Sequence, residues 1–346
     1  MNVMVGVPYS SNGRLGDEAA SLDCDVMISA GSLFRANKGG FQSIGPLVFR
    51  LWGRCALDSA GFVAMKQGGY RWDVSEYVDF VRRGWGPRGH SVGVPWKWWS
   101  SMDYCCEPEI ADDQAEVTRR VQKTAATLGE TFEEVDYWRE TEGDTDLDDP
   151  MPILQGWSVD DYLESIELTE QALKAHGRSW PARIGVGSVC RRHLHHGTHG
   201  LLVVLQAIHE RLPSGVKLHL FGVKGDVLRA LSPELADRIE SIDSMAWDFA
   251  VRKRVPTGQR TVEVRAKSMR GWVERQRASI RGREVAPITE APVTLRPASC
   301  PQCGFSVKSA SLVELTFGSR PRRRVDGSVV RVRQSWCRDC RHGKAA

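Results

Sequence analysis

The sequence predicts an α/β fold built on a parallel sheet, and among such folds it favours a (β/α)8, TIM-like barrel. Two observations lead to this class. Short apolar runs alternate with segments of helical period before about residue 250, and the strand-plus-helix units number six or seven. No phosphate-binding glycine fingerprint follows the first unit, which counts against a doubly wound sheet.

Seven apolar runs are the candidate strands. In chain order they are DVMISAG (25–31), CALDSAG (55–61), SVGVPWKW (91–98), PILQGW (152–157), RIGVGSV (183–189), KLHLFGV (217–223) and SIDSMAW (241–247). The clearest helix spans 159–177, because its apolar residues recur at helical spacing and it ends in glycine. We expect the barrel to occupy residues 1–255 and a second, basic domain to occupy 256–346.

Polar residues fall at or just past the C-terminal ends of several of these runs. They are Asp58, Asp103, Gln155, Ser188 and Asp243. In (β/α)8 barrels the catalytic groups come from this rim, so these five are the candidate site residues. A structural role stays open for each, since an aspartate after a strand often caps a turn or a helix by accepting a backbone N–H.

Composition narrows the class of protein. The chain has 346 residues, of which 41% are hydrophobic and 26% charged, enough for a sizeable core. No run of about 18 apolar residues is present, and the first residues, MNVMVGVPYSSNG, do not resemble a signal peptide. The nine cysteines are an odd number, which suits a reducing compartment better than a disulfide framework. We therefore expect a cytoplasmic protein without a membrane partner.

The charge is unevenly distributed along the chain. The net charge is only +4, but residues 107–149 hold 15 acidic and 4 basic residues, whereas 251–346 hold 22 basic and 7 acidic ones. Two basic clusters stand out: 265–283, expected to be helical, and 320–333, expected to form a hairpin around Asp326 and Gly327. The clusters favour binding to a nucleic acid, with a solvated surface as the alternative.

The C-terminal region also carries two C-x-x-C pairs, separated by 33 residues. The four cysteines are Cys300, Cys303, Cys337 and Cys340. Four thiolates in two such pairs are typical of a closed tetrahedral zinc site that holds a small module together. His342 could replace one of them. The zinc is expected to be structural, and the predicted fold is a barrel with a basic C-terminal zinc-ribbon-like module.

Two other stretches are candidates for function. Residues 193–199, HLHHGTH, place four histidines within seven positions, which suits a metal-dependent nucleic-acid hydrolase using His193, His195, His196 and His199. No aspartate accompanies them, so a polar loop that leads into a helix is the alternative, and Arg191, Arg192 or His193 could contact a nucleotide. The tryptophans of VPWKWWSSMDY (94–104) are either core residues or a surface for an extruded base.

Six stretches occur in the order of the motifs of tRNA-guanine transglycosylases. They are LDSAGF (57–62), MDYCCEP (102–108), ILQGW (153–157), IGVGSV (184–189), LFGVKG (220–225) and IDSMAW (242–247). The resemblance covers residues 27–254. The chain looks most similar to the DpdA-type DNA-guanine transglycosylases of phages and bacterial genomic islands. That resemblance implies exchange of guanine in DNA for a 7-deazaguanine base such as preQ0.

The resemblance also implies roles for individual residues. Asp243 matches the nucleophile that forms a covalent intermediate with the sugar, and Asp58 matches the general acid and base. Asp103 and Gln155 match the residues that contact the purine. The turn Gly187, Ser188 and Val189 matches backbone contacts to the base, although Ser188 stands where many tRNA enzymes have glycine.

The polymer substrate is the least constrained feature of this resemblance. The tRNA enzymes use a C-x-C-x-x-C arrangement with a later histidine, from which this chain departs, and its basic tail suits DNA phosphates. The alternative is a tRNA substrate, because a basic zinc module could grip an RNA stem and no residue visibly tests for a 2′-hydroxyl. The expected partners are thus DNA or tRNA, the free bases and auxiliary modification proteins, in the host cytoplasm if the gene is carried by a phage.

Overall fold

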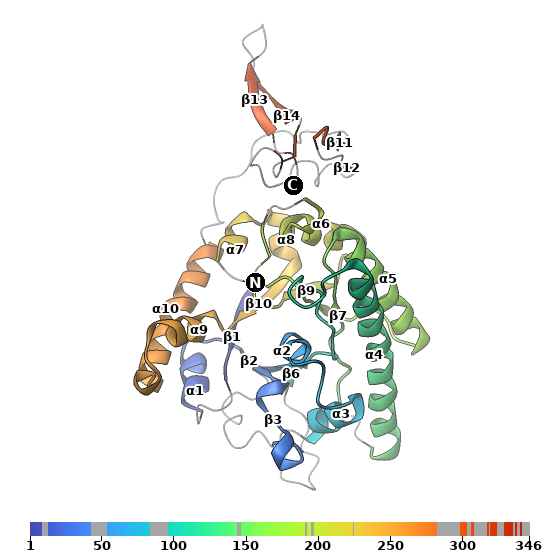
Figure 1. The fold of residues 1–346 in the computed structure, drawn as a ribbon, viewed down its shortest axis with the longest axis vertical. Helices are drawn as coiled ribbons and strands as arrows, with labels where there is room; N and C mark the ends of the chain where they lie inside the picture. The colour runs from blue at the N-terminus through green and yellow to red at the C-terminus, as the bar shows by residue number, and fades with distance from the viewer. Residues whose placement is uncertain are drawn as a thin grey trace.

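Figure 1 presents the computed structural model of the chain. It describes residues 1–8, 13–42, 54–83, 96–143, 147–190, 192–194, 197–223 and 225–281, and, in the C-terminal part, 298–302, 306–307, 317, 319–323, 329–334, 336–337 and 340. Among the helices in these ranges, none is both long enough and apolar enough to cross a membrane.

A single curled sheet of eight parallel strands forms the centre of the described chain (Figure 1). Its order is β6-β5-β2-β1-β10-β9-β8-β7. The strands are β1 (Asn2–Gly6), β2 (Val26–Ser29), β5 (Cys55–Asp58), β6 (Trp96–Trp99), β7 (Ile153–Leu154), β8 (Arg183–Val186), β9 (Lys217–Leu220) and β10 (Ile239–Ser244). The prediction of an α/β fold with a parallel sheet is confirmed.

The two edge strands of the sheet meet beyond their ends. Ser100 and Met151 form an isolated parallel bridge. The N–H of Met151 donates to the carbonyl of Trp99 at 2.7 Å, and the N–H of Ser101 donates to the carbonyl of Met151 at 3.0 Å. The segment after β6 is therefore hydrogen-bonded to the segment before β7, which brings the ends of the curled sheet together.

Helices connect the strands and surround the sheet (Figure 1). They are α1 (Arg14–Ser21), α2 (Gly61–Lys66), α3 (Val74–Arg83), α4 (Gln114–Thr141), α5 (Val159–Ala175), α6 (Leu201–Arg211), α7 (Asp226–Ala230), α8 (Pro233–Arg238), α9 (Ala246–Arg254) and α10 (Val262–Arg281). Helix α5 confirms the predicted helix, and it begins with a capping box in which Ser158 and Asp161 bond each other's backbone N–H.

Each of the seven predicted strand runs overlaps an observed strand, but the eighth strand was missed. Strand β1 (NVMVG) lies at the middle of the sheet, paired with β2 on one side and β10 on the other. The predicted strand at 91–98 starts only at Trp96, and residues 84–95 lie outside the described chain.

Because successive side chains of a strand point to opposite faces of the sheet, the buried residues form two separate cores. The larger core lies between the sheet and the helices and includes Val5, Ile28 and Leu57. A smaller cluster lies inside the curl: Met4, Met27, Ala56, Trp98, Met151 and Ile153. The tryptophans Trp96, Trp98 and Trp99 are all buried, so their interpretation as core residues is confirmed.

In its described residues the C-terminal part contains two small antiparallel sheets. Strands β11 (Ala298–Ser299) and β12 (Ser306–Val307) form one, and β13 (Ser319–Arg323) and β14 (Val329–Arg333) form the other. A third such pair, β3 (Phe34–Arg35) and β4 (Gly40–Phe41), lies near the N-terminus. The pairing of β13 with β14 confirms the predicted hairpin, whose turn at Asp326 and Gly327 lies outside the described residues.

Helix α10 confirms the helix expected at 265–283, starting three residues earlier. It packs on the main core through Met269, Trp272 and Val273 and contacts α1, α9 and β1. Since this helix shares the core of the sheet, we propose that the first domain extends to Arg281 and not only to residue 255.

Candidate active site and metal centre

The predicted site residues lie at the carboxyl ends of the strands. Asp58 is the last residue of β5 and points to the same side as Ala56 of the inner cluster. Asp243 of β10 pairs with Met4, another inner residue. Burial, together with the nearby Asp103 and Asp243 carboxylates, raises the pKa of Asp58 to about 7, against hydrogen bonds from Ser29 and Ala60. The structure thus brings the three aspartates together at the mouth of the sheet.

Asp103, Gln155 and Ser188 form one buried hydrogen-bonded network. Asp103 accepts a hydrogen bond from the hydroxyl of Ser59 at 2.5 Å and another from Nε2 of Gln155. Oε1 of Gln155 accepts from the Ser188 hydroxyl at 2.6 Å. All three predicted residues are under 8% exposed. These contacts fix which end of the Gln155 amide is the donor and which is the acceptor.

The backbone turns beside this network have little room for larger residues. A Cβ on Gly187 would overlap the Gln155 amide, and a Cβ on Gly61 would lie 2.6 Å from Oδ1 of Asp103. Ser188 has a φ of 50° and Ala60 a φ of 74°, in the left-handed region that residues with a Cβ seldom adopt. Such conformations persist where the surrounding structure holds them, and they are often found at functional sites.

Glu107 is a buried carboxylate that the sequence analysis missed. Its Oε2 lies 3.0 Å from the Ser188 hydroxyl, which also accepts the N–H of Cys106 at 2.7 Å. Burial raises the pKa of Glu107. A hydroxyl has one proton to donate, so a protonated Glu107 can donate to Ser188 while Ser188 donates to Gln155. The signal in the sequence was its place in MDYCCEP, the segment that follows β6.

Asp243 is held from strand β9 and the turn after it. Its Oδ1 accepts the N–H of Gly222 at 2.8 Å and lies 3.4 Å from Nε2 of His219. The other ring nitrogen of His219, Nδ1, lies 2.8 Å from the Ser241 hydroxyl. His219 was also missed, although a histidine within the apolar run KLHLFGV is a visible signal. The Gly222 N–H and the His219 ring thus lie next to the same oxygen of Asp243, and the hydrogen bond from Gly222 orients the carboxylate.

Arg192 has a structural role and is not a phosphate contact. It is buried, and its guanidinium donates to the carbonyls of Trp157 at 2.7 Å, Ser188 at 3.1 Å and Gly156 at 3.1 Å. These bonds tie the turn after β7 to the turn after β8. The expectation that Arg192 could contact a nucleotide is therefore wrong.

The histidine cluster at 193–199 is only partly described. His193 is exposed, and Nδ1 of His199 lies 3.2 Å from the carbonyl of Trp157. His195 and His196 lie outside the described residues, as does Arg191. Where side chains are described, the group that could hold a metal consists of cysteines alone and includes no histidine.

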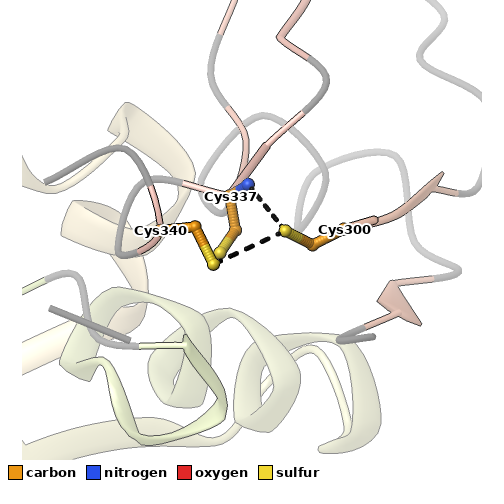
Figure 2. Close-up of side chains that lie close together, drawn as sticks. All are labelled: Cys300, Cys337 and Cys340. Carbon is orange, nitrogen blue, oxygen red and sulfur yellow. Dashed lines mark hydrogen bonds between the residues drawn. The ribbon is translucent and has the colours of Figure 1, made fainter. Parts of the chain in front are cut away.

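Figure 2 shows Cys300, Cys337 and Cys340 pointing toward one another. Their ligand atoms all lie within 4.8 Å, and the sulfurs of Cys300 and Cys340 are 3.7 Å apart. Tetrahedral zinc with Zn–S distances of about 2.3 Å places its sulfurs about 3.8 Å apart, so the separation suits a shared ion. The three residues could therefore bind a metal such as zinc. The predicted fourth ligand Cys303, and His342, lie outside the described residues.

Comparison with known proteins gives one result. The family model DpdA, described as "DeoxyPurine in DNA protein A", matches residues 46–315, which is more than half of the chain. The matched range includes all the predicted site residues at the strand ends and Cys300 and Cys303. No curated protein matches the chain.

Proposed function

The chain belongs to the DpdA family, which is involved in 7-deazapurine modification of DNA, and we propose that it is a DNA-guanine transglycosylase. In the proposed reaction a guanine in DNA is exchanged for a 7-deazaguanine base, with preQ0 as the candidate. The observation that carries the proposal is the meeting of Asp58, Asp103 and Asp243 at the strand ends, where the pKa of Asp58 is raised to about 7.

We propose that the curled sheet is a (β/α)8 barrel. The hydrogen bonds between the segments next to β6 and β7 support closure of the eight strands. In a closed barrel the carboxyl ends of all strands surround one mouth. This geometry would place a nucleotide against groups from β5, β7, β8 and β10 at the same time.

Asp243 is the proposed nucleophile of the first step. Its carboxylate oxygen attacks C1′ of the target nucleotide and forms a C–O bond, while the C1′–N9 bond to guanine breaks through an oxocarbenium-like transition state. The electron pair of that bond leaves with the purine, and protonated Asp58 gives its proton to a ring nitrogen of the departing base. Oδ1 of Asp243 already accepts from Gly222, so Oδ2 is the proposed attacking atom.

The second step reverses the first with a different base. The incoming 7-deazaguanine gives the proton on its five-membered-ring nitrogen to the Asp58 carboxylate, and that nitrogen attacks C1′. The bond between Asp243 and the sugar then breaks, which frees Asp243 as a carboxylate. Asp58 gives one proton to the departing guanine and receives another from the incoming base, so it ends protonated as it began and acts first as acid and then as base.

Asp103, Gln155 and the turn at Gly187, Ser188 and Val189 are the proposed base-binding groups. The Watson–Crick edge of guanine offers two donors, N1–H and the 2-amino group, and one acceptor, O6. A carboxylate has about four acceptor positions. In Asp103 the Ser59 hydroxyl and the Gln155 amide use two, and the Cys105 thiol lies 4.0 Å from Oδ2, so at least one donor of the base can still be bound. The buried network would hold Asp103 in place before the base enters.

The cysteine site is proposed to be structural. Cys300, Cys337 and Cys340 would hold a zinc ion with Cys303 as the fourth thiolate, leaving no ligand position for water. When bound, the ion would stabilise the fold of the C-terminal module. The basic residues of that module and of α10 would contact DNA phosphates.

Incorporation of labelled base tests the proposed function. The protein is incubated with labelled guanine or preQ0 and with duplex DNA, single-stranded DNA or unmodified tRNA. We expect label in DNA, with a yield that falls steeply as salt rises because phosphate contacts release counterions. Asp243→Ala should abolish incorporation without unfolding the protein. Label in tRNA alone would overturn the DNA substrate, and normal incorporation by Asp243→Ala would overturn the nucleophile.

A further inference from the structure

The solvent-facing side of helix α9 carries an apolar stripe that ends in a cation. Met245, Phe249 and Lys253 are spaced four residues apart, so they follow one another along one face. Met245 is 37% exposed and Phe249 52% exposed. The Lys253 ammonium lies 4.8 Å from the centre of the Phe249 ring, which places the two side chains on the same face.

The opposite side of α9 is fixed to the protein. Trp247 is buried and its indole N–H donates to the carbonyl of Gly6 at 3.2 Å. Asp248 is buried between Arg252 and Arg265, with both ion pairs near 2.7 Å. These anchors prevent the helix from rolling, so the apolar stripe stays turned toward solvent.

The stripe begins at the mouth of the candidate site. Met245 follows Asp243 by two residues, and its side chain lies over the end of β1, where it would overlap a Cβ placed on Gly6. Phe249 is one helical turn further from the mouth, and its backbone N–H bonds the carbonyl of Met245. Met245 and Phe249, two of the exposed large apolar side chains in the described chain, therefore lie side by side near the proposed nucleophile.

The burial of the candidate site residues next to such a stripe suggests how duplex DNA is opened. Asp103 and Asp243 are each 7% exposed, so a guanine stacked in a duplex cannot reach them and must be extruded. Proteins that unstack DNA insert apolar side chains, commonly phenylalanine and methionine, into the base stack. Exposed cations beside the wedge then contact the flanking phosphates.

We propose that Met245 and Phe249 form a wedge that enters the DNA base stack beside the extruded guanine, with Lys253 on a flanking phosphate. This inference rests on the proposed function and adds how the target guanine is extruded from the duplex. The charge of the surroundings favours a polyanion, because the last turn of α9 carries Arg252, Lys253 and Arg254, all exposed.

The experiment compares duplex and single-stranded substrates of one sequence. Phe249→Ala should lower base exchange in the duplex by about tenfold to one hundredfold, the size of a lost aromatic stacking contact. Exchange in the single strand should change by less than about threefold, because no stack has to be opened. Tyr137→Ala is the matched control: Tyr137 is 54% exposed on α4 and should affect neither substrate. Phe249→Trp keeps an aromatic ring at this position and should therefore retain the duplex exchange that Phe249→Ala loses.

Base opening can also be followed directly. A duplex with 2-aminopurine next to the target guanine should become more fluorescent on binding to the wild type and less so with Phe249→Ala. Equal losses on both substrates, or a wild type active on single strands alone, would overturn the wedge but leave the proposed exchange intact. Conversion of a dimer to a monomer by Phe249→Ala, measured by light scattering, would assign the stripe to a second copy instead. Failure of the wild type on every DNA would overturn the proposed function itself.

Discussion

Asp58→Asn should inactivate the protein and yet stabilise it above neutral pH. The folded protein raises the pKa of Asp58 from 3.8 to about 7, mainly because the side chain is buried. Between these two values the unfolded chain carries an ionised Asp58 and the folded chain a neutral one. The contribution of Asp58 to the free energy of unfolding is therefore fully present below pH 3.8 and is lost as the pH rises to about 7. Asparagine keeps the shape of the side chain and cannot ionise, so it avoids the loss.

The size of the effect follows from the shift. From pH 5 to about 7 the wild type loses about 1.4 kcal/mol for each pH unit, or about 3 kcal/mol in all. Since Asp58 is not wholly shielded from solvent, we expect about 2–3 kcal/mol. The stability of Asp58→Asn relative to the wild type should therefore rise by that amount from pH 5 to pH 8, while exchange activity falls by about 10²–10⁴ at every pH.

Urea denaturation of both proteins at pH 5 and pH 8, with zinc held constant, measures the difference. Asp112→Asn is the control, because its carboxylate is exposed and its removal should give the same stability difference at both pH values. If Asp58→Asn gains no stability between pH 5 and pH 8, Asp58 is ionised in the folded protein at neutral pH. It could not then be the acid that protonates the leaving guanine.

Three further predictions concern other parts of the molecule. Gly187→Ala should raise KM for the free base about tenfold or more, because its Cβ displaces the Gln155 amide; steady-state kinetics with unchanged KM would contradict this. His219→Phe should lower kcat about tenfold to one hundredfold with little change in KM, because it removes the ring nitrogen that lies 3.4 Å from Oδ1 of Asp243, and His219→Gln should lose less, since it keeps a polar group beside that oxygen. Removal of zinc by a chelator, or Cys337→Ser, should unfold the C-terminal module and weaken DNA binding while the circular dichroism of the sheet domain persists; an unchanged melting curve would count against the metal site.

Local patterns were sufficient to predict most of the fold. Seven apolar runs, a capped amphipathic helix and a basic hairpin all appear where the sequence places them, because each depends on neighbouring residues. Strand β1 was missed for the opposite reason. Its five residues carry little pattern of their own, and its place between β2 and β10 depends on a strand more than 230 residues away.

The same distinction holds for the site. The positions of Asp58, Asp103, Gln155, Ser188 and Asp243 could be predicted because each lies at or just past the carboxyl end of a strand, and parallel strands bring these ends together; their roles stay predictions. Glu107 and His219 could not, because their contacts depend on register between segments. Glu107 meets a residue 81 positions away, and His219 faces the site only because β9 pairs with β10 so that His219 lies opposite Ser241. The larger first domain that we propose was not expected, since the charge of α10 conceals its buried apolar face.

Asp58 and Asp243 have the same side chain but different surroundings at the carboxyl ends of the strands, which suits the opposite roles of acid and nucleophile that we propose for them. Asp243 accepts the Gly222 N–H and lies beside His219. Asp58 is buried near two other carboxylates, and both conditions favour its neutral form. The charge on Asp243 thus helps to keep the proton on Asp58. The proposed exchange needs this division, because the sugar must be attacked by a carboxylate while the leaving base is protonated by an acid. Formation of the bond from Asp243 to C1′ removes that negative charge, which makes Asp58 a stronger acid at the moment when its proton is transferred.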